Sequence, residues 1–122
     1  MLENAIESTN VSTVKAPLVV EAANHPITPE ADAILRDGGV TVVPDILANA
    51  GGVTGSYFEW TANLTAFRWS EERFSHELLS FLGRAFQSVW ERHLERQVDL
   101  RTAAYMGGIA RVAEAVRLRG LA

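Results

Sequence analysis

Two short apolar runs, with a helix signal between them, constrain the fold of this chain more than any other feature. The runs cover residues 17–23 and 40–45 and are rich in β-branched side chains. Neither run alternates polar and apolar residues, a pattern typical of strands covered on both faces in a parallel sheet. Between them, Thr28-Pro29-Glu30 is a favourable helix start and Gly38-Gly39 a favourable helix end. The sequence therefore predicts a right-handed βαβ unit with two buried, parallel strands.

The rest of the chain is predicted to be mainly helical. Residues 2–14 predict a short polar helix or turn. Apolar side chains recur at helical spacing over residues 71–96, where Ser70 can cap the start, and over residues 100–119, where Asp99 can do so. The stripe expected to pack in the first of these helices consists of Phe74, Leu78, Phe81, Leu82, Ala85, Phe86, Val89, Trp90 and Leu94. The pattern as a whole predicts an α/β fold with two parallel strands and a mostly helical C-terminal half.

Glycines mark two further segments. Gly107-Gly108 are expected to interrupt the last helix, at a cost of roughly 1 kcal/mol each relative to alanine. Residues 46–56 form a Gly-rich segment that follows the second strand and is expected to enter a helix at residues 57–60. Glycines there would let a ligand approach the backbone, and free amides at a helix start attract anions. Close packing of a helix on the sheet explains the same glycines, and the dinucleotide fingerprint Gly-x-Gly-x-x-Gly is absent.

Composition excludes several classes of function. A chain of 122 residues has room for one small domain, which we expect to divide into a βαβ part (1–60) and a helical part (61–122). The absence of cysteine excludes disulfides and thiolate metal sites, and the spacing of the three histidines predicts no metal centre. A net charge of −4 argues against a nucleic-acid partner. No apolar run approaches the roughly 20 residues of a membrane span, and the acidic N-terminus is unlike a signal peptide, so we expect a cytoplasmic protein.

The sheet edges raise a question of assembly. Two parallel strands do not make a self-sufficient sheet, because three or more strands are the usual minimum. The sequence offers no further strand to pair with the outer edges. We therefore expect either that copies of this chain assemble into a homo-oligomer or that a larger partner completes the sheet.

Long motifs occur in a fixed order along almost the whole chain. They are PDILANAGGV (44–53), SYFEW (56–60), VEAANHPITPEAD (20–32), DLRTAAY (99–105), RVAEA (111–115) and RG (119–120), together with Asn63, Trp69 and the opening Leu2-Glu3-Asn4. Together these motifs resemble the C-terminal signature of the glutamate dehydrogenases. The resemblance implies a C-terminal fragment of a Rossmann-like nucleotide-binding domain, from enzymes that interconvert glutamate and 2-oxoglutarate with NAD or NADP.

The resemblance also implies roles for individual residues. In this family the catalytic lysine and acid belong to a separate substrate domain, and this chain matches neither, so no catalytic residue is expected here. Asn24 and Asn49 match contacts to the nicotinamide-ribose side of the cofactor, while Val53 and Ser56 match positions that meet the substrate side chain. Packing alone remains the alternative role for all four residues. His25 departs from the small or apolar residue usual after the asparagine, and could crowd a cofactor.

Three functions fit these observations. The first is a non-catalytic, oligomerising or accessory subunit of amino-acid metabolism, partnered by itself or by a full-length amino-acid dehydrogenase. The second is a remnant or split piece of an NAD(P)-dependent glutamate dehydrogenase. The third is a small-molecule sensor that binds an amino acid or a nucleotide at residues 49–56. In each case we expect no dehydrogenase turnover from the isolated chain.

Overall fold

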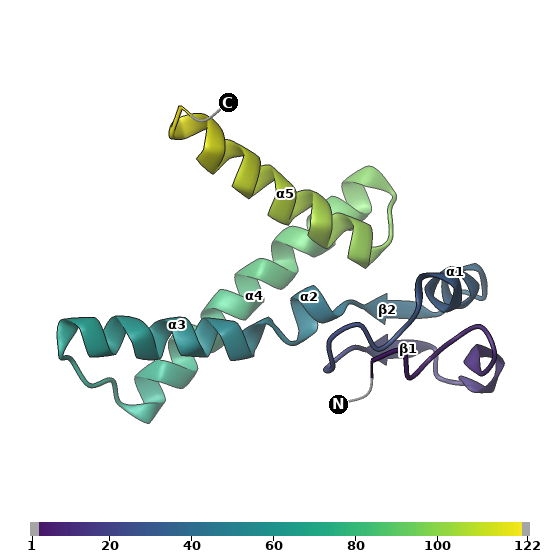
Figure 1. The fold of residues 1–122 in the computed structure, drawn as a ribbon, viewed down its shortest axis with the longest axis horizontal. Helices are drawn as coiled ribbons and strands as arrows, with labels where there is room; N and C mark the ends of the chain where they lie inside the picture. Colours follow the sequence, from purple (N-terminus) through teal and green to yellow (C-terminus); the bar gives the residue numbers. More distant parts are fainter. Residues whose placement is uncertain (1–2, 121–122) are drawn as a thin grey trace.

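The computed structural model describes residues 3–120 and shows an α/β arrangement in which a two-stranded parallel sheet joins a set of helices (Figure 1). In chain order the elements are a 3-10 turn η1 (Val11–Thr13), β1 (Leu18–Val20), α1 (Pro29–Asp37), β2 (Thr41–Val43), α2 (Asp45–Ala48), α3 (Ala50–Thr65), α4 (Glu71–Arg96) and α5 (Leu100–Leu118). The expected polar helix or turn over residues 2–14 is reduced to η1, and Leu2 lies outside the described residues.

The βαβ unit is confirmed. β1 and β2 pair in parallel, with Val19 opposite Val42. The predicted helix start also forms, because the Thr28 side chain accepts a hydrogen bond from the backbone N–H of Ala31 and Pro29 occupies the first turn of α1. Side chains of η1, α1, one sheet face and the segment that leads into α1 make the first apolar core, which contains Val11, Ile27, Ala31 and Leu35 and is bordered by Val19, Val40 and Val42.

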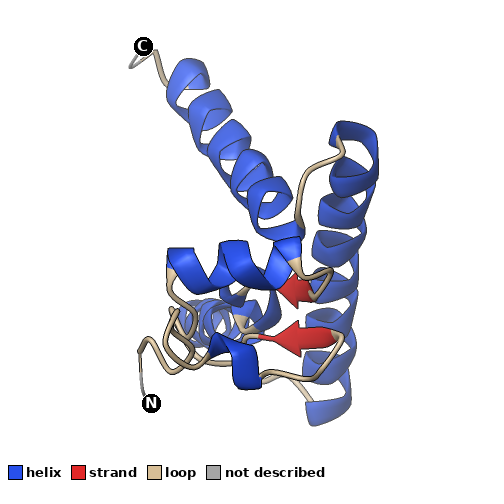
Figure 2. Cartoon of the chain, turned by 90° about the vertical axis from the view of Figure 1, so that its right-hand side faces the viewer, coloured by secondary structure: helices blue, strands red, loops and turns tan. Residues whose placement is uncertain are grey.

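The prediction that both strands are covered on both faces is wrong. On the face away from α1, Val43 of β2 packs against a second core formed by α2, α4 and α5. The same face of β1 has no such cover within residues 3–120, and Leu18 and Val20 are 52% and 57% exposed. Figure 2 shows the two strands with helices gathered beside β2. The apolar run at residues 17–23 therefore reflects a strand with one open face and one open edge.

The Gly-rich segment is helical, so the expected entry into a helix at Tyr57 is also wrong. α3 begins at Ala50 and contains Gly51, Gly52 and Gly55. A Cβ at Gly55 would lie 3.2 Å from Cζ of Phe74, and one at Gly51 would lie 3.4 Å from a methyl group of Leu82. Both neighbours belong to α4, so two of these glycines allow α3 to approach α4 closely.

The two long helices form largely as predicted. The side chains of Ser70 and Asp99 cap α4 and α5 by accepting hydrogen bonds from Arg73 N and Thr102 N. α5 runs through Gly107-Gly108 without a break, so the expected interruption is not present. Because alanine and other helix formers surround these glycines, the helix persists despite their low propensity.

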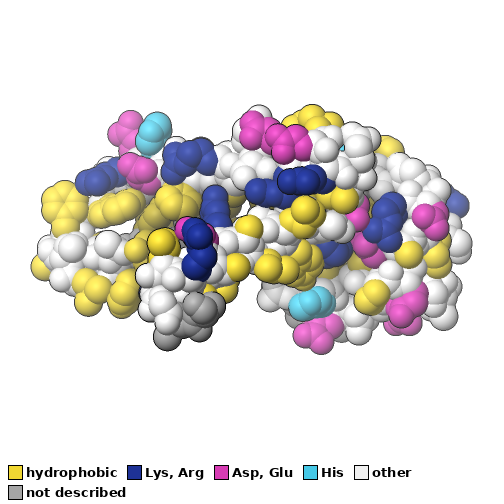
Figure 3. Space-filling view, turned by 90° about the horizontal axis from the view of Figure 1, so that it is seen from above, with side chains coloured by type: hydrophobic (Ala, Val, Ile, Leu, Met, Phe, Trp, Pro, Cys, Tyr) yellow, Lys and Arg dark blue, Asp and Glu magenta, His cyan; other side chains and the backbone are white. Residues whose placement is uncertain are grey.

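The apolar stripe of α4 is wider than its neighbours can cover. α3 packs against one end of α4 and α5 against the other, and the two arms diverge (Figures 1 and 2). Val89 is buried, while Phe81, Phe86, Trp90 and Leu94 from the predicted stripe are exposed. Figure 3 shows hydrophobic side chains gathered at the end of the molecule where α3 meets α4. α4 therefore carries more apolar side chains than the other described residues cover.

Candidate functional site

The candidate site lies where the two parallel strands end. Asn24 follows β1 and Asn49 follows α2, which itself begins directly after β2. The Nδ2 of Asn49 donates to Oδ1 of Asn24 at 2.6 Å and to the carbonyl oxygen of Ala22 at 3.4 Å. The structure thus brings together two asparagines that are 25 positions apart. Ligands of open parallel sheets bind at this carboxyl end of the strands.

A tight turn holds Asn24. The next residue, His25, has a left-handed backbone with φ of 46°, and its backbone N–H donates to Oδ2 of Asp45 at 2.9 Å. Its carbonyl oxygen accepts from the N–H of Asn4 at 2.9 Å. The turn after Asn24 is therefore fixed by bonds from both backbone polar groups of His25.

Val53 and Ser56 lie on α3, one and two turns after Asn49. Positions separated by four and seven residues share one face of a helix, so Asn49, Val53 and Ser56 line the same side. Val53 is 73% exposed, and the Ser56 hydroxyl donates to the carbonyl oxygen of Gly52 at 3.1 Å. The face that carries these residues turns away from α4.

Beneath the asparagine pair lies a charged network that the sequence analysis did not identify as part of a site. Arg101, in the first turn of α5, donates to Oε1 of Glu21 at 2.7 Å and to Oδ1 of Asp32 at 3.1 Å. Its other terminal nitrogen lies 3.6 Å from Oδ1 of Asp45. Oε2 of Glu21 accepts from the backbone N–H of Asp45 at 2.7 Å, which links the ends of the two strands.

The centre of the network is a buried carboxylate. Glu21 is only 2% exposed, and a carboxylate at such a depth requires a charged partner and further hydrogen bonds. The signal was present in the sequence as a single glutamate at the end of an apolar run, followed by a single aspartate at the end of the next. The basic partner, Arg101, lies 80 positions from Glu21, so no local pattern pointed to it.

The surroundings shift the pKa values of two members of the network. Burial alone would raise the pKa of Asp45, but hydrogen bonds from the N–H groups of His25 and Ile46 and the charge of Arg101 outweigh it, so the pKa lies below its ordinary value. Burial would lower the pKa of Arg101, yet the bonds to Glu21 and Asp32 raise it above its ordinary value. These surroundings therefore favour the ionised forms of Asp45 and Arg101.

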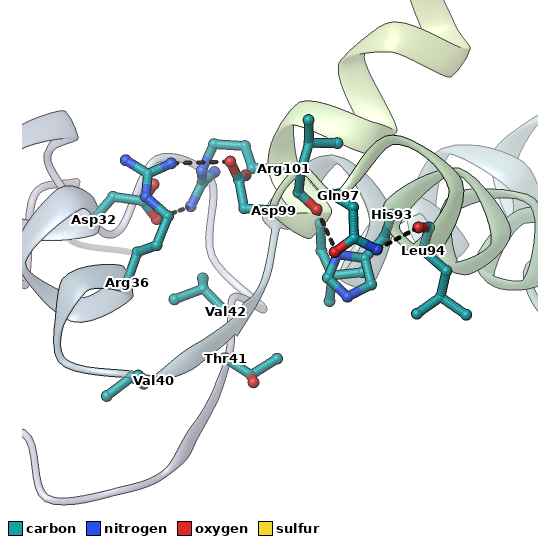
Figure 4. A pocket seen from close by; sticks show the side chains of 13 residues that line it. Asp32, Arg36, Val40, Thr41, Val42, His93, Leu94, Gln97, Asp99 and Arg101 are labelled. Atoms are coloured by element: carbon teal, nitrogen blue, oxygen red, sulfur yellow. Dashed lines mark hydrogen bonds and ion pairs between the residues drawn. The ribbon is translucent and has the colours of Figure 1, made fainter.

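A pocket of about 440 Å³ borders the network on the side of β2 and the α4–α5 turn (Figure 4). Its charged side chains are engaged with one another: Arg36 bonds to Asp99 at 2.9 Å, and Arg101 bonds to Asp32. Within the described part of the chain, no buried side-chain polar atom lacks a hydrogen-bond partner. The charged side chains that line the pocket are therefore already paired within the protein.

Across residues 3–120, histidine and acidic side chains form no group of three or more that could hold a metal ion. None of the helices described here combines the length and apolar character needed to cross a membrane.

Comparison with known proteins gives a consistent result. The chain is 50% identical over 121 residues to an NAD-specific glutamate dehydrogenase of Staphylococcus aureus, covering 99% of this chain and 29% of the relative. It is 51% identical over 115 residues to NADP-specific glutamate dehydrogenase A1 of Halobacterium salinarum, covering 93% of this chain and 28% of the relative. The chain thus spans less than a third of the length of these relatives.

Solved structures agree in fold. Glutamate dehydrogenase from Peptoniphilus asaccharolyticus matches all of this chain with a TM-score of 0.93 and 39% identity, over 31% of its own length. A hetero-hexameric glutamate dehydrogenase from Thermus thermophilus, in a Leu-bound form, matches 96% of this chain with a TM-score of 0.92 and 38% identity, over 28% of its own length. The family model for glutamate/leucine/phenylalanine/valine dehydrogenases matches residues 1–120. The chain therefore belongs to the glutamate/leucine/phenylalanine/valine dehydrogenase family.

Proposed function

We propose that this chain forms the C-terminal part of an NAD(P)-dependent glutamate dehydrogenase. In this proposal it holds the nicotinamide-ribose side of the cofactor and one wall of the substrate site, while the catalytic groups come from elsewhere. The observation that carries the proposal is the hydrogen bond between Asn24 and Asn49 at the carboxyl ends of the strands.

The chemistry of the asparagine pair fits a ribose. Within residues 3–120, neither Nδ2 of Asn24 nor Oδ1 of Asn49 has a protein partner, so the pair presents one donor and one acceptor. A sugar hydroxyl can accept from the first and donate to the second. The face beside the pair is open, because a Cβ at Gly52 would meet nothing within 4 Å. The residues present therefore fit a nicotinamide cofactor.

The substrate wall is proposed for the same face of α3. Val53 would give apolar contact to the aliphatic part of a substrate side chain, and Ser56 would give a hydroxyl group. A bound NAD or NADP supplies the oxidant that accepts hydride from the substrate. This chain's own residues bind and orient, and we expect no turnover from the chain alone.

A chimera tests the proposal. This chain would replace the matching C-terminal segment of the Staphylococcus aureus enzyme, and NADH formation from glutamate would be followed spectroscopically. Asn24→Ala and Asn49→Ala should raise the KM for NAD more than they lower kcat, while Val53→Ala should act on the KM for glutamate. Glu114→Gln, on the exposed end of α5, is the control and should change neither. Unchanged KM values for NAD in both asparagine variants would contradict the proposal.

A second candidate function is that of an oligomerising or accessory subunit of a dehydrogenase. It is favoured by the open face and edge of β1 and by the exposed apolar residues of α5, among them Ile109 and Val112. The Thermus thermophilus relative is itself hetero-hexameric. Light scattering on the purified chain, alone and mixed with a full-length amino-acid dehydrogenase, tests this candidate, and a monomer in both samples would exclude it.

A further inference from the structure

A continuous path of hydrogen bonds and one ion pair leads from α5 to the turn that carries Asn24. It starts at Arg101, whose guanidinium bonds to Glu21 and Asp32 and lies near Asp45. Four elements or their ends meet at this one side chain, because Glu21 follows β1, Asp32 belongs to α1, Asp45 begins α2 and Arg101 belongs to α5. A planar guanidinium can serve several carboxylates in one fixed geometry.

The path continues through two carboxylates. One oxygen of Glu21 accepts from Arg101 and the other accepts from the N–H of Asp45, so the orientation of Glu21 is set from both sides. The Asp45 carboxylate then accepts from the N–H of His25 at 2.9 Å and from the N–H of Ile46 at 2.7 Å. The first of these bonds fixes the turn after Asn24, and the second fixes the start of α2, the short helix that Asn49 directly follows.

Both asparagines are thus positioned by the same carboxylate. Glu21 and Asp45 lie almost entirely out of water, and Arg101 is 22% exposed at its side chain, so water cannot readily replace the lost partners if one is removed. We propose that Arg101 is a positioning residue, which sets the Asn24–Asn49 pair through Glu21 and Asp45. Its consequence for cofactor binding rests on the proposed function, whereas the coupling to the asparagine pair does not.

A neighbouring ion pair supplies a matched control. Arg36 of α1 bonds to Asp99 at the start of α5 at 2.9 Å, so it joins the same two helices. It has no bond to Glu21 or Asp45 among the described residues. Loss of Arg36 therefore loosens the α1–α5 junction without breaking the path to the asparagines.

The test uses NMR spectra of the full 122-residue chain. The readouts are the side-chain amide signals of Asn49 and the backbone amide signal of His25, which report the two ends of the path. Arg101→Met should shift all of them, and Arg101→Lys should do so as well, because one ammonium group cannot reproduce the planar, multidentate contact. Arg36→Met should leave them at their wild-type positions.

Arg101→Lys keeps the positive charge, so its NMR spectrum tests the role of Arg101 if Arg101→Met fails to fold. A folded Arg101→Lys chain with wild-type Asn49 and His25 signals would overturn the inference, as would equal shifts in Arg36→Met. In the chimera described above, Arg101→Lys should also raise the KM for NAD. If Asn24→Ala and Asn49→Ala leave that KM unchanged, the proposed function fails, but the NMR shifts still decide the role of Arg101.

Discussion

Glu21 offers the sharpest test of what holds the strand ends together. Its side chain is fully buried and has two partners at 2.7 Å, the guanidinium of Arg101 and the backbone N–H of Asp45. Glu21→Ala removes both interactions and leaves the N–H of Asp45 without an acceptor. Glu21→Gln removes the charge but keeps a carbonyl oxygen that can accept from this N–H. The two variants therefore separate the ionic contribution from the hydrogen bond.

Their magnitudes follow from the burial. Removing one partner of a buried ion pair costs about 3–5 kcal/mol. Because Arg101 retains Asp32 and Asp45 as partners, we expect the loss of the ion pair to cost an amount near the lower end of this range. In Glu21→Ala the unsatisfied N–H of Asp45 adds about 1–3 kcal/mol. We expect Glu21→Ala to lose about 4 kcal/mol in free energy of unfolding, within that range, and Glu21→Gln to lose about 2 kcal/mol, as for a hydrogen bond to a charged group.

Urea unfolding followed by circular dichroism measures both losses. Glu114→Gln is the control, since Glu114 pairs with Arg117 at the surface, where an ion pair contributes at most about 1 kcal/mol. At high salt the small loss in free energy of unfolding caused by Glu114→Gln should disappear, whereas the losses caused by the Glu21 substitutions should remain, because buried ion pairs are screened less than exposed ones. The reasoning is refuted if Glu21→Gln unfolds at the wild-type midpoint. It is also refuted if the two Glu21 variants lose the same free energy. Should Glu21→Ala be unfolded without urea, Glu21→Gln alone decides.

Acidification should lower the unfolding free energy. Because the pKa values of Asp45 and Asp99 lie below the ordinary value, their contribution is present above about pH 4 and is lost as the pH falls from there towards the folded-state pKa; urea midpoints that do not fall would contradict this. Gly83→Ala should stabilise the chain by about 0.5–1 kcal/mol and so raise its thermal midpoint, since the added Cβ would meet nothing within 4 Å. Gly55→Ala, close to Phe74, should give no such gain, and equal gains would argue against tight α3–α4 packing. Phe58→Ala should cost about 3–5 kcal/mol in urea unfolding, because its buried ring meets Phe74 and Phe81 edge-on; the exposed Tyr57→Ala should cost far less.

Local signals carried most of the fold prediction. The starts of α1, α4 and α5 were predictable because Thr28, Ser70 and Asp99 cap their own helices through bonds to residues only three positions away. The parallel pairing of β1 and β2 followed from the length of the helical crossover between them. Each of these inferences needs only neighbouring residues.

Burial and the charged network required information from distant residues. An apolar run predicts a strand, but the open face of Leu18 and Val20 depends on which helices reach it. The glycines at the start of α3 suggested a loop because their packing partner, α4, was not visible in the local pattern. Asn24 and Asn49 were identified by resemblance, and the bond between them depends on a turn fixed by Asp45.

The candidate site divides into two parts with different requirements. Asn24 and Asn49 are held by contacts made entirely within this chain, so their geometry is set before any ligand arrives. Such preorganisation reduces the ordering cost of binding. Val53 faces outward, and among the described residues nothing packs over it, so a pocket around it needs a second surface opposite α3. The proposed cofactor contact is thus intrinsic to this chain, whereas the proposed substrate contact depends on what lies across from it. The isolated chain therefore has a preformed polar contact at the asparagine pair, whereas the α3 face becomes a pocket only when a second surface covers it.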